Sequence, residues 1–335
     1  MSIDRPCLSQ KATPILLSLR LIKCLESRVF SDIRAMNLEA TFLDLGRLDG
    51  RLTHSPAFQP WLIKARLEGA AIAACNAGVP VLASDLEAWI SGSRNPPRAT
   101  EGLNDPMSVA AVVYYYFMSL EQSRAPNDHA VARLLRSILD HESEARLWAG
   151  TDLVYFGPLW RALSETAVAP GLEPTIPSVA KRLHEMLRLA IKAEGRRQVA
   201  ATAFDGRQLI LSPDDRRAWL VSLMAPRLLR RAGITRNLIP SLVPVMRFLD
   251  DRPQDITEKL HDCIRQRVRD GSKELSAMEQ KIAGFALAYR RTARSRLQLA
   301  AELGLALPSL SRAKLAIAVN STPAGAGYLK RQLVG

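Results

Sequence analysis

The residues from Arg296 to Leu315 have types and a spacing that could place polar side chains against the edges of DNA bases. Their sequence, RLQLAAELGLALPSLSRAKL, suits two crossed helices joined by a turn. The template positions are a small residue at the crossing, a glycine with positive φ in the turn and apolar residues behind it, here Ala300, Gly304, Leu305 and Leu310. In a helix-turn-helix of this kind the second helix enters the major groove. The segment therefore predicts double-stranded DNA as a partner.

The side chains outside this packing define the predicted contacts. Leu299 and Leu303 fall on the buried face of the first helix, and Pro308 suits the first turn of the second, where a missing N–H costs nothing. The outward residues are then Ser309, Ser311, Arg312 and Lys314. We expect Ser309 and Arg312 to contact bases, and Ser311 and Lys314 to lie nearer to phosphates. An ordinary helical hairpin with a central glycine is the alternative reading.

The segment after the motif, NSTPAGAGYLKRQLVG, predicts a wing. Gly325 and Gly327 indicate a tight turn, and residues 328–334 indicate a short strand that carries Lys330 and Arg331. A strand of this kind beside a recognition helix is typical of a winged helix-turn-helix. A frayed C-terminal tail is the alternative.

Positive charge is concentrated at the same end of the chain. The whole sequence carries 46 Lys and Arg against 33 Asp and Glu, a net charge of +13. From Arg265 onward there are 13 basic residues against 4 acidic ones. A basic cluster stands just before the motif, made of Arg290, Arg291, Arg294 and Arg296. We expect this cluster to hold backbone phosphates and to supply salt-sensitive affinity that does not depend on sequence.

Composition places the chain among globular proteins. With 335 residues, 47% hydrophobic and 6% aromatic, it has enough apolar material for two or three domains. The N-terminus lacks the pattern of a secretory signal, and the most apolar run, residues 109–120, is too short to cross a bilayer. The sequence therefore predicts a cytoplasmic protein without a membrane partner, associated with the nucleoid when it is bound to DNA.

Cysteine, histidine and carboxylate patterns predict neither a metal nor a cofactor. The four Cys form no CxxC pair, and the five His lack the spacing of metal ligands. The neighbouring carboxylates Asp214-Asp215 and Asp250-Asp251 diverge on a helix, where such pairs complement the dipole of a first turn. The chain contains no GxSxG, Walker or GxGxxG motif. We therefore expect no catalytic activity.

The elements that must position these residues are predicted to be mainly α-helical, since Leu, Ala and Arg dominate the sequence. Apolar spacing, caps and breakers predict helices near residues 38–51, 57–76, 84–90, 107–122, 127–142, 144–149, 178–195, 214–232, 236–249, 253–270 and 273–293. A short hairpin is predicted around Asp205-Gly206, within residues 199–211. The Pro- and Gly-rich residues 150–178 suggest a hinge.

These elements suggest four parts. We expect an N-terminal extension (1–36), an N-terminal helical domain (37–150), a central helical domain (151–272) and a winged helix-turn-helix DNA-binding domain (273–335). A single reading motif gives limited specificity, so a homodimer on a palindromic site is expected.

Two stretches carry a resemblance to a known family. Residues 45–86, LGRLDGRLTHSPAFQPWLIKARLEGAAIAACNAGVPVLASDL, and residues 219–242, WLVSLMAPRLLRRAGITRNLIPSL, resemble a family of uncharacterised proteins from rhizobial symbiosis plasmids. In that family an RLDxRLxxSP run precedes an apolar helix, a Gly-Val and Asp-Leu step and an Arg-containing loop, which residues 94–103 match. The resemblance implies a C-terminal helix-turn-helix and DNA binding, and it brings no catalytic activity.

A remoter similarity links residues 223–233, LMAPRLLRRAG, to the helix that follows the catalytic loop of Fic-type nucleotide transferases. Their loop reads HPFxxGNGR, whereas this chain has LSPDDRR at residues 211–217. The general base and the anion-binding glycines are both missing. The alternative to a DNA-binding regulator is therefore an inactive helical interaction scaffold derived from a Fic-like fold.

Overall fold

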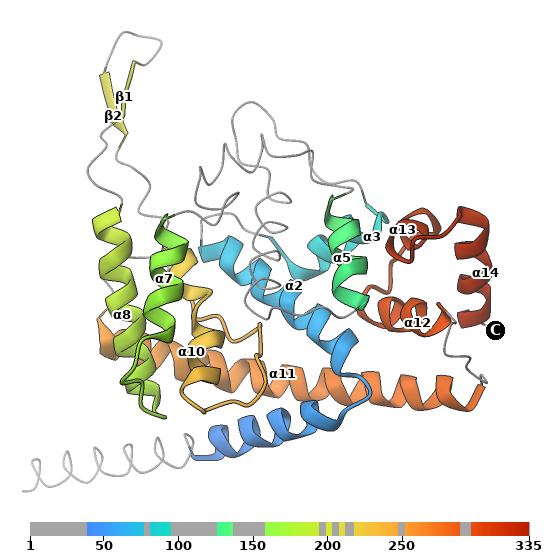
Figure 1. Cartoon of the computed structure of the whole chain (residues 1–335), viewed down its shortest axis with the longest axis horizontal. Helices are drawn as coiled ribbons and strands as arrows, with labels where there is room; N and C mark the ends of the chain where they lie inside the picture. The colour runs from blue at the N-terminus through green and yellow to red at the C-terminus, as the bar shows by residue number, and fades with distance from the viewer. Residues whose placement is uncertain are drawn as a thin grey trace, which may run out of the picture. The chain divides into compact units, whose positions relative to one another are not determined.

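The computed structural model describes residues 39–76, 81–94, 126–136, 158–193, 199–202, 208–211, 218–246, 252–288 and 296–334. Within these ranges the fold is mainly α-helical, as the sequence predicts (Figure 1). The predicted extension 1–36 and the predicted helices 107–122 and 144–149 lie outside the described residues.

Residues 39–54 are helical. The helices that follow are α2 (Phe58–Asn76), α3 (Ala83–Ser91), α5 (Pro126–Arg136), α7 (Pro158–Val168), α8 (Ile176–Ala193), α9 (Ala218–Ser222), α10 (Ala225–Arg231), α11 (Pro253–Ala288), α12 (Leu297–Ala306), α13 (Arg312–Ala318) and α14 (Pro323–Val334). The strands β1 (Val199–Thr202) and β2 (Gln208–Leu211) pair antiparallel in the register Val199 to Leu211. This pairing confirms the predicted hairpin. Helix α7, by contrast, lies inside the segment predicted as a hinge.

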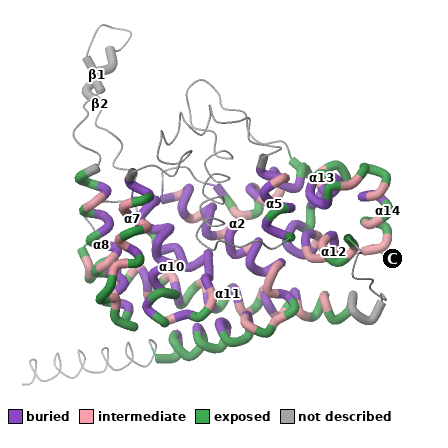
Figure 2. The backbone as a smooth tube through the Cα atoms, viewed as in Figure 1, coloured by how far each residue is buried: buried purple, intermediate pink, exposed green. Residues whose placement is uncertain are grey.

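Helix α2 lies at the centre of the packing. Apolar residues are spread around the helix instead of lying on one face, and most of its residues are buried (Figure 2). The helix packs against α3, α9, α11 and α12. Its small residues Gly69, Ala70, Ala73 and Ala74 are buried and allow these neighbours to approach closely.

Helix α11 is one continuous helix where the sequence predicts two. The predicted break lies at Gly271, but the glycine is needed for packing and not for a turn. The indole N–H of Trp61 donates to Gly271 O at 3.0 Å, and a Cβ on Gly271 would lie 3.1 Å from Trp61 Cζ2. The absent side chain makes room for the indole ring while the helix runs on.

The predicted helix 236–249 is wrong for its described part, because residues 236–246 form a loop. Pro240 and Pro244 lack the N–H that a helix interior needs. The buried carboxylate of Asp49 accepts from Arg236 N at 2.6 Å and from Asn237 N at 2.9 Å. Amide hydrogens that a helix would leave unpaired at its start are thus bound by a side chain from residues 39–54.

Two compact units divide the chain, Met1–Asp44 and Leu45–Gly335. The predicted domain boundary between residues 272 and 273 falls in the middle of α11, and no compact unit begins there. The C-terminal helices belong to the same unit because α12 packs on α2 and α5. Among the described residues, no helix combines the length and apolarity that a membrane crossing requires.

Glu68 on α2 should make stability depend on pH. Burial, followed by the nearby Glu274 carboxylate, raises its pKa to about 7, from 4.5. The folded chain therefore holds this proton more tightly than the unfolded chain. The contribution of Glu68 to stability is complete below about pH 4.5 and is lost as the pH rises through 7.

Glu68→Gln mimics the protonated carboxyl and should leave stability unchanged near pH 4. Above pH 7 it should raise the free energy of unfolding by about 1–2 kcal/mol, a value reduced for the partial exposure of the side chain. Urea unfolding from pH 4 to 8 measures this difference, with Glu165→Gln on the exposed face of α7 as the control. A gain of the same size at every pH would contradict the prediction.

Candidate nucleic-acid interface

Helices α12, α13 and α14 form the C-terminal three-helix unit, residues 296–334 (Figure 1, red). Within it α14 packs against both α12 and α13. The unit is joined to the preceding helices, since α12 contacts α2 and α5, and α13 contacts α3 and α5. The helix that the sequence assigns to base reading is therefore supported on several sides.

The turn between α12 and α13 differs from the predicted template. Gly304 lies inside α12 and does not have positive φ, and Pro308 lies in the turn before α13. The backbone N–H of Leu307 still donates to Leu303 O at 2.7 Å, and both Leu307 and Leu310 are buried. The turn extends to Ser311, whose side chain caps the second helix. The second helix consequently begins at Arg312.

The predicted wing is wrong, because residues 323–334 form helix α14 and not a strand. Thr322 begins this helix: its side-chain oxygen accepts from Gly325 N at 3.1 Å, and its carbonyl accepts from Ala326 N at 2.9 Å. Pro323 follows at the first helical position, where proline is favoured. The Thr-Pro pair is a helix start signal that outweighs the two glycines read as a hairpin turn.

The predicted contact residues lie around the start of α13 and on α14. Ser309, Arg312, Lys330 and Arg331 are exposed, as is Arg296 before α12, while Ser311 and Lys314 are half-buried. Arg290, Arg291 and Arg294 lie outside the described residues. The structure thus groups the described members of the predicted set in one three-helix unit.

The side chain of Arg312 lies against α14 at Gly327. A Cβ on Gly327 would stand 3.2 Å from Arg312 Nε and 3.5 Å from Cζ. A Cβ at this position would require the Arg312 side chain to shift by a few tenths of an ångström. Sequence reasoning assigned Gly327 to a turn and missed this role.

Lys314 and Ser311 lie over the end of α3. Gly92 caps that helix with φ +68, and a Cβ on it would lie 2.8 Å from Lys314 Cγ and 3.1 Å from Ser311 Oγ. Ser311 caps α13, with its hydroxyl accepting from Lys314 N at 3.3 Å. Partial burial lowers the pKa of Lys314. Ser311 thus caps the helix, and its expected position near a phosphate stays a prediction.

Two of the basic side chains also brace the unit. Lys330 Nζ donates to Leu310 O at 2.9 Å, and Arg296 Nη1 donates to Asn320 O at 2.5 Å. The Lys330 bond links Leu310, before the start of α13, to α14. The Arg296 bond links Asn320, after the end of α13, to the residue before α12. Because both residues remain exposed, their positive charge still faces solvent.

Almost all charged residues of the three-helix unit are basic. Residues 296–334 contain five basic residues and one acidic residue, Glu302. Glu302 is engaged, since its carboxylate accepts from Gln298 Nε2 at 2.8 Å and from Asn127 Nδ2 at 2.7 Å. A second carboxylate comes from α3: Glu87 Oε1 accepts from Ser309 N at 3.1 Å. The exposed basic groups would attract a polyanion such as a nucleic-acid backbone.

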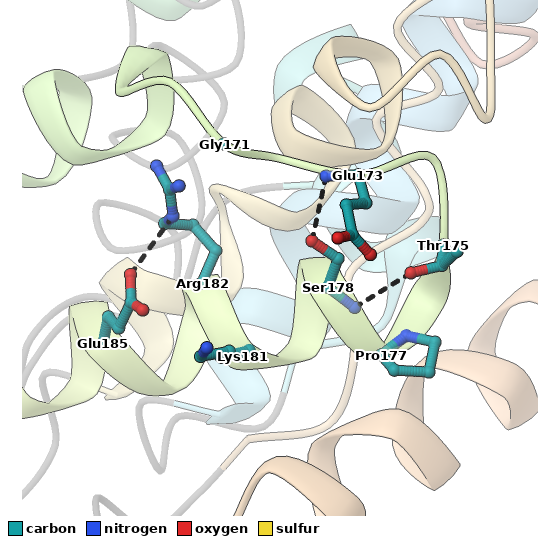
Figure 3. A pocket seen from close by; sticks show the side chains of 8 residues that line it. All are labelled: Gly171, Glu173, Thr175, Pro177, Ser178, Lys181, Arg182 and Glu185. Atoms are coloured by element: carbon teal, nitrogen blue, oxygen red, sulfur yellow. Dashed lines mark hydrogen bonds and ion pairs between the residues drawn. The ribbon is translucent and has the colours of Figure 1, made fainter.

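Other parts of the described chain offer weaker candidates. A polar pocket at the start of α8 is drawn in Figure 3, but its groups bind one another: Glu173 N donates to Ser178 Oγ at 3.0 Å, and Arg182 Nε pairs with Glu185 Oε2 at 3.2 Å. No group of three or more His, Cys, Asp or Glu among the described residues is placed to hold a metal ion. Burial raises the pKa of the Cys263 thiol to about 12, so this thiol is unreactive near neutral pH.

No protein-family profile, curated protein or solved structure matches this chain. The resemblances to the rhizobial plasmid family and to Fic-type proteins therefore stay predictions from the sequence.

Proposed function

We propose that the chain binds double-stranded DNA through its C-terminal three-helix unit and acts as a transcriptional or plasmid-associated regulator. The observation that carries the proposal is the positive charge of this unit: four exposed basic residues and the half-buried Lys314 against one carboxylate, Glu302, which is engaged in hydrogen bonds. A short helix with a basic first turn is an arrangement that can reach base edges in the major groove.

In the proposed complex the contacts divide into two classes. Arg312 and Ser309, exposed at the start of α13 and in its turn, read bases. Phosphates are held by Arg296, Lys314, Lys330 and Arg331, together with the cluster Arg290, Arg291 and Arg294. Ser311 caps α13 with its hydroxyl oxygen and lies near the phosphates, to which its O–H can donate. A homodimer on a palindromic site would double the number of bases read.

The test is fluorescence anisotropy of the full chain with a random-sequence duplex and with a duplex selected by the wild-type protein from a random pool. Arg312→Ala should reduce the preference for the selected duplex by about 1–3 kcal/mol, because a base contact is lost. Lys314→Ala should weaken both duplexes alike and lower the salt slope by about 0.9, the effect of one phosphate contact.

Matched control variants remove one arginine and one lysine charge outside the three-helix unit. Arg161→Ala on α7 and Lys181→Ala on α8 are exposed and should change neither the preference nor the affinity measurably. Absence of binding at 50 mM salt would refute the proposal. An Arg312→Ala variant as selective as the wild type would refute only the base-reading assignment.

The second candidate is a helical interaction scaffold. It is favoured by the enclosure of α13, which packs against α3, α5 and α14. An apolar protein interface should keep its affinity between about 50 and 200 mM salt, whereas DNA binding through several basic residues should weaken steeply. The salt series therefore separates the two candidates.

A further inference from the structure

A guanidinium from another helix holds the C-terminal end of α13. Arg133 on α5 donates from Nε to Ile317 O at 3.2 Å and to Ala318 O at 3.1 Å, and its Nη2 also donates to Ala318 O. The last carbonyls of a helix lack partners within it and carry the negative end of the dipole. A half-buried cation at this place satisfies both needs.

The helix that carries Arg133 is itself anchored at its first turn. Asn127 Nδ2 donates to Glu302 on α12 at 2.7 Å. Asp128 forms an ion pair with Arg66 of α2, and both side chains are fully or almost fully buried. Because α5 is fixed to the central helix and to α12, the position of the Arg133 guanidinium is fixed as well.

The opposite end of α13 is held in a comparable way. Ser311 N donates to Ser91 O, the last residue of α3, at 2.8 Å. Helix α13 has only seven residues, which is too short for stability from its own hydrogen bonds. Contacts at both ends with helices that precede the C-terminal unit therefore add to those that Lys330 and Arg296 make within it.

We propose that Arg133 is a positioning residue for DNA binding. Its planar fork binds two successive carbonyls and fixes the direction of α13, so that Arg312 and Ser309 meet the bases together. Lysine retains the charge but lacks this fork, and it cannot reproduce the geometry. The inference rests on the proposed function and adds that α5, outside the three-helix unit, governs its selectivity.

The experiment uses Arg133→Gln and Arg133→Lys in the full chain, with Arg161→Gln and Arg161→Lys as controls for charge and side-chain type. Anisotropy gives the affinity for the random duplex and for the duplex selected by the wild type. Both Arg133 variants should lose about tenfold in the ratio of these affinities, the discrimination that one good base contact carries. In Arg133→Lys the salt slope with random duplex should stay unchanged, since no phosphate contact is removed.

The outcomes separate the two proposals. Wild-type selectivity in Arg133→Lys would show that Arg133 supplies charge alone and would overturn the positioning role. A wild-type chain that binds duplexes without preference would overturn it too. A wild-type chain that binds no duplex would overturn the proposed DNA-binding function itself. If circular dichroism shows that Arg133→Gln does not fold, the lysine variant decides.

Discussion

Replacing Arg66 by Met is expected to lower the free energy of unfolding by about 3–5 kcal/mol. The Arg66 side chain is completely buried on α2, and its partner Asp128 on α5 is 3% exposed. One carboxylate oxygen of Asp128 already lacks a hydrogen-bond partner among the described residues. Removal of the guanidinium would leave a buried charge without its counterion, which is the costly way to break an ion pair.

The double variant Arg66→Met with Asp128→Leu distinguishes this explanation from a loss of packing. With both charges gone, the desolvation cost disappears, and most of the lost stability should return. Urea unfolding of the two single variants and the double variant gives the coupling energy directly. A double variant as unstable as the sum of the single ones would contradict an ion-pair role. Since α5 carries Arg133, the single variants should also reduce DNA selectivity.

The sequence is sufficient to predict an element where local signals, such as apolar runs, glycines and turn residues, define its ends. Helix α2 is predicted almost to the residue, since a long, mostly apolar run without a breaker inside it is followed by Gly78 and Pro80. The stop after α10 is also predicted from Gly233, which has φ +74 in the structure, but the single helix predicted over 214–232 is wrong in its described part, because a turn at residues 223–224 divides it into α9 and α10. The hairpin at residues 199–211 follows from its Asp-Gly turn signal.

The errors arise where contacts in space, and not the local pattern alone, contribute to the local structure. Residues 236–246 form a loop that contains Pro240 and Pro244, and Asp49, nearly 190 positions earlier, binds the amides of Arg236 and Asn237. The sequence predicts Gly304 as a turn residue, yet α12 continues past it to Ala306, and Leu307 and Leu310 after its end are buried. The hydrophobic periodicity of the sequence does not reveal these contacts.

For the candidate site, too, the sequence predicts some features and not others. The residue types of the basic set were readable from the sequence, and the described members share one structural unit. Their individual roles were not readable, because capping by Ser311 and bracing by Lys330 depend on neighbours in space. Arg133, in a helix about 180 residues before α13, gave no signal in the sequence.

Trp61→Ala is the second substitution expected to have a large effect, about 3–5 kcal/mol of unfolding free energy. The side chain is 1% exposed in the central packing, between α2 and α11. Truncation leaves a cavity and removes the indole N–H bond to Gly271 O. Trp61→Phe removes the hydrogen bond but keeps most of the ring volume, so it should cost much less. Thermal and urea unfolding of both variants measure the two contributions.

Gly271→Ala tests this explanation further. Whether the substitution stabilises or destabilises the protein should depend on the presence of the Trp61 ring. In the wild type the new methyl group would lie 3.1 Å from Trp61 Cζ2 and 3.4 Å from Leu48 Cδ2, so it should destabilise despite its better helix propensity. In the Trp61→Ala background the ring is gone, and the same methyl should stabilise α11 by about 1 kcal/mol. A destabilising Gly271→Ala in both backgrounds would mean that the glycine serves the backbone and not the ring. A reversal of sign would establish that a packing requirement, invisible in the local sequence, placed a glycine inside a 36-residue helix.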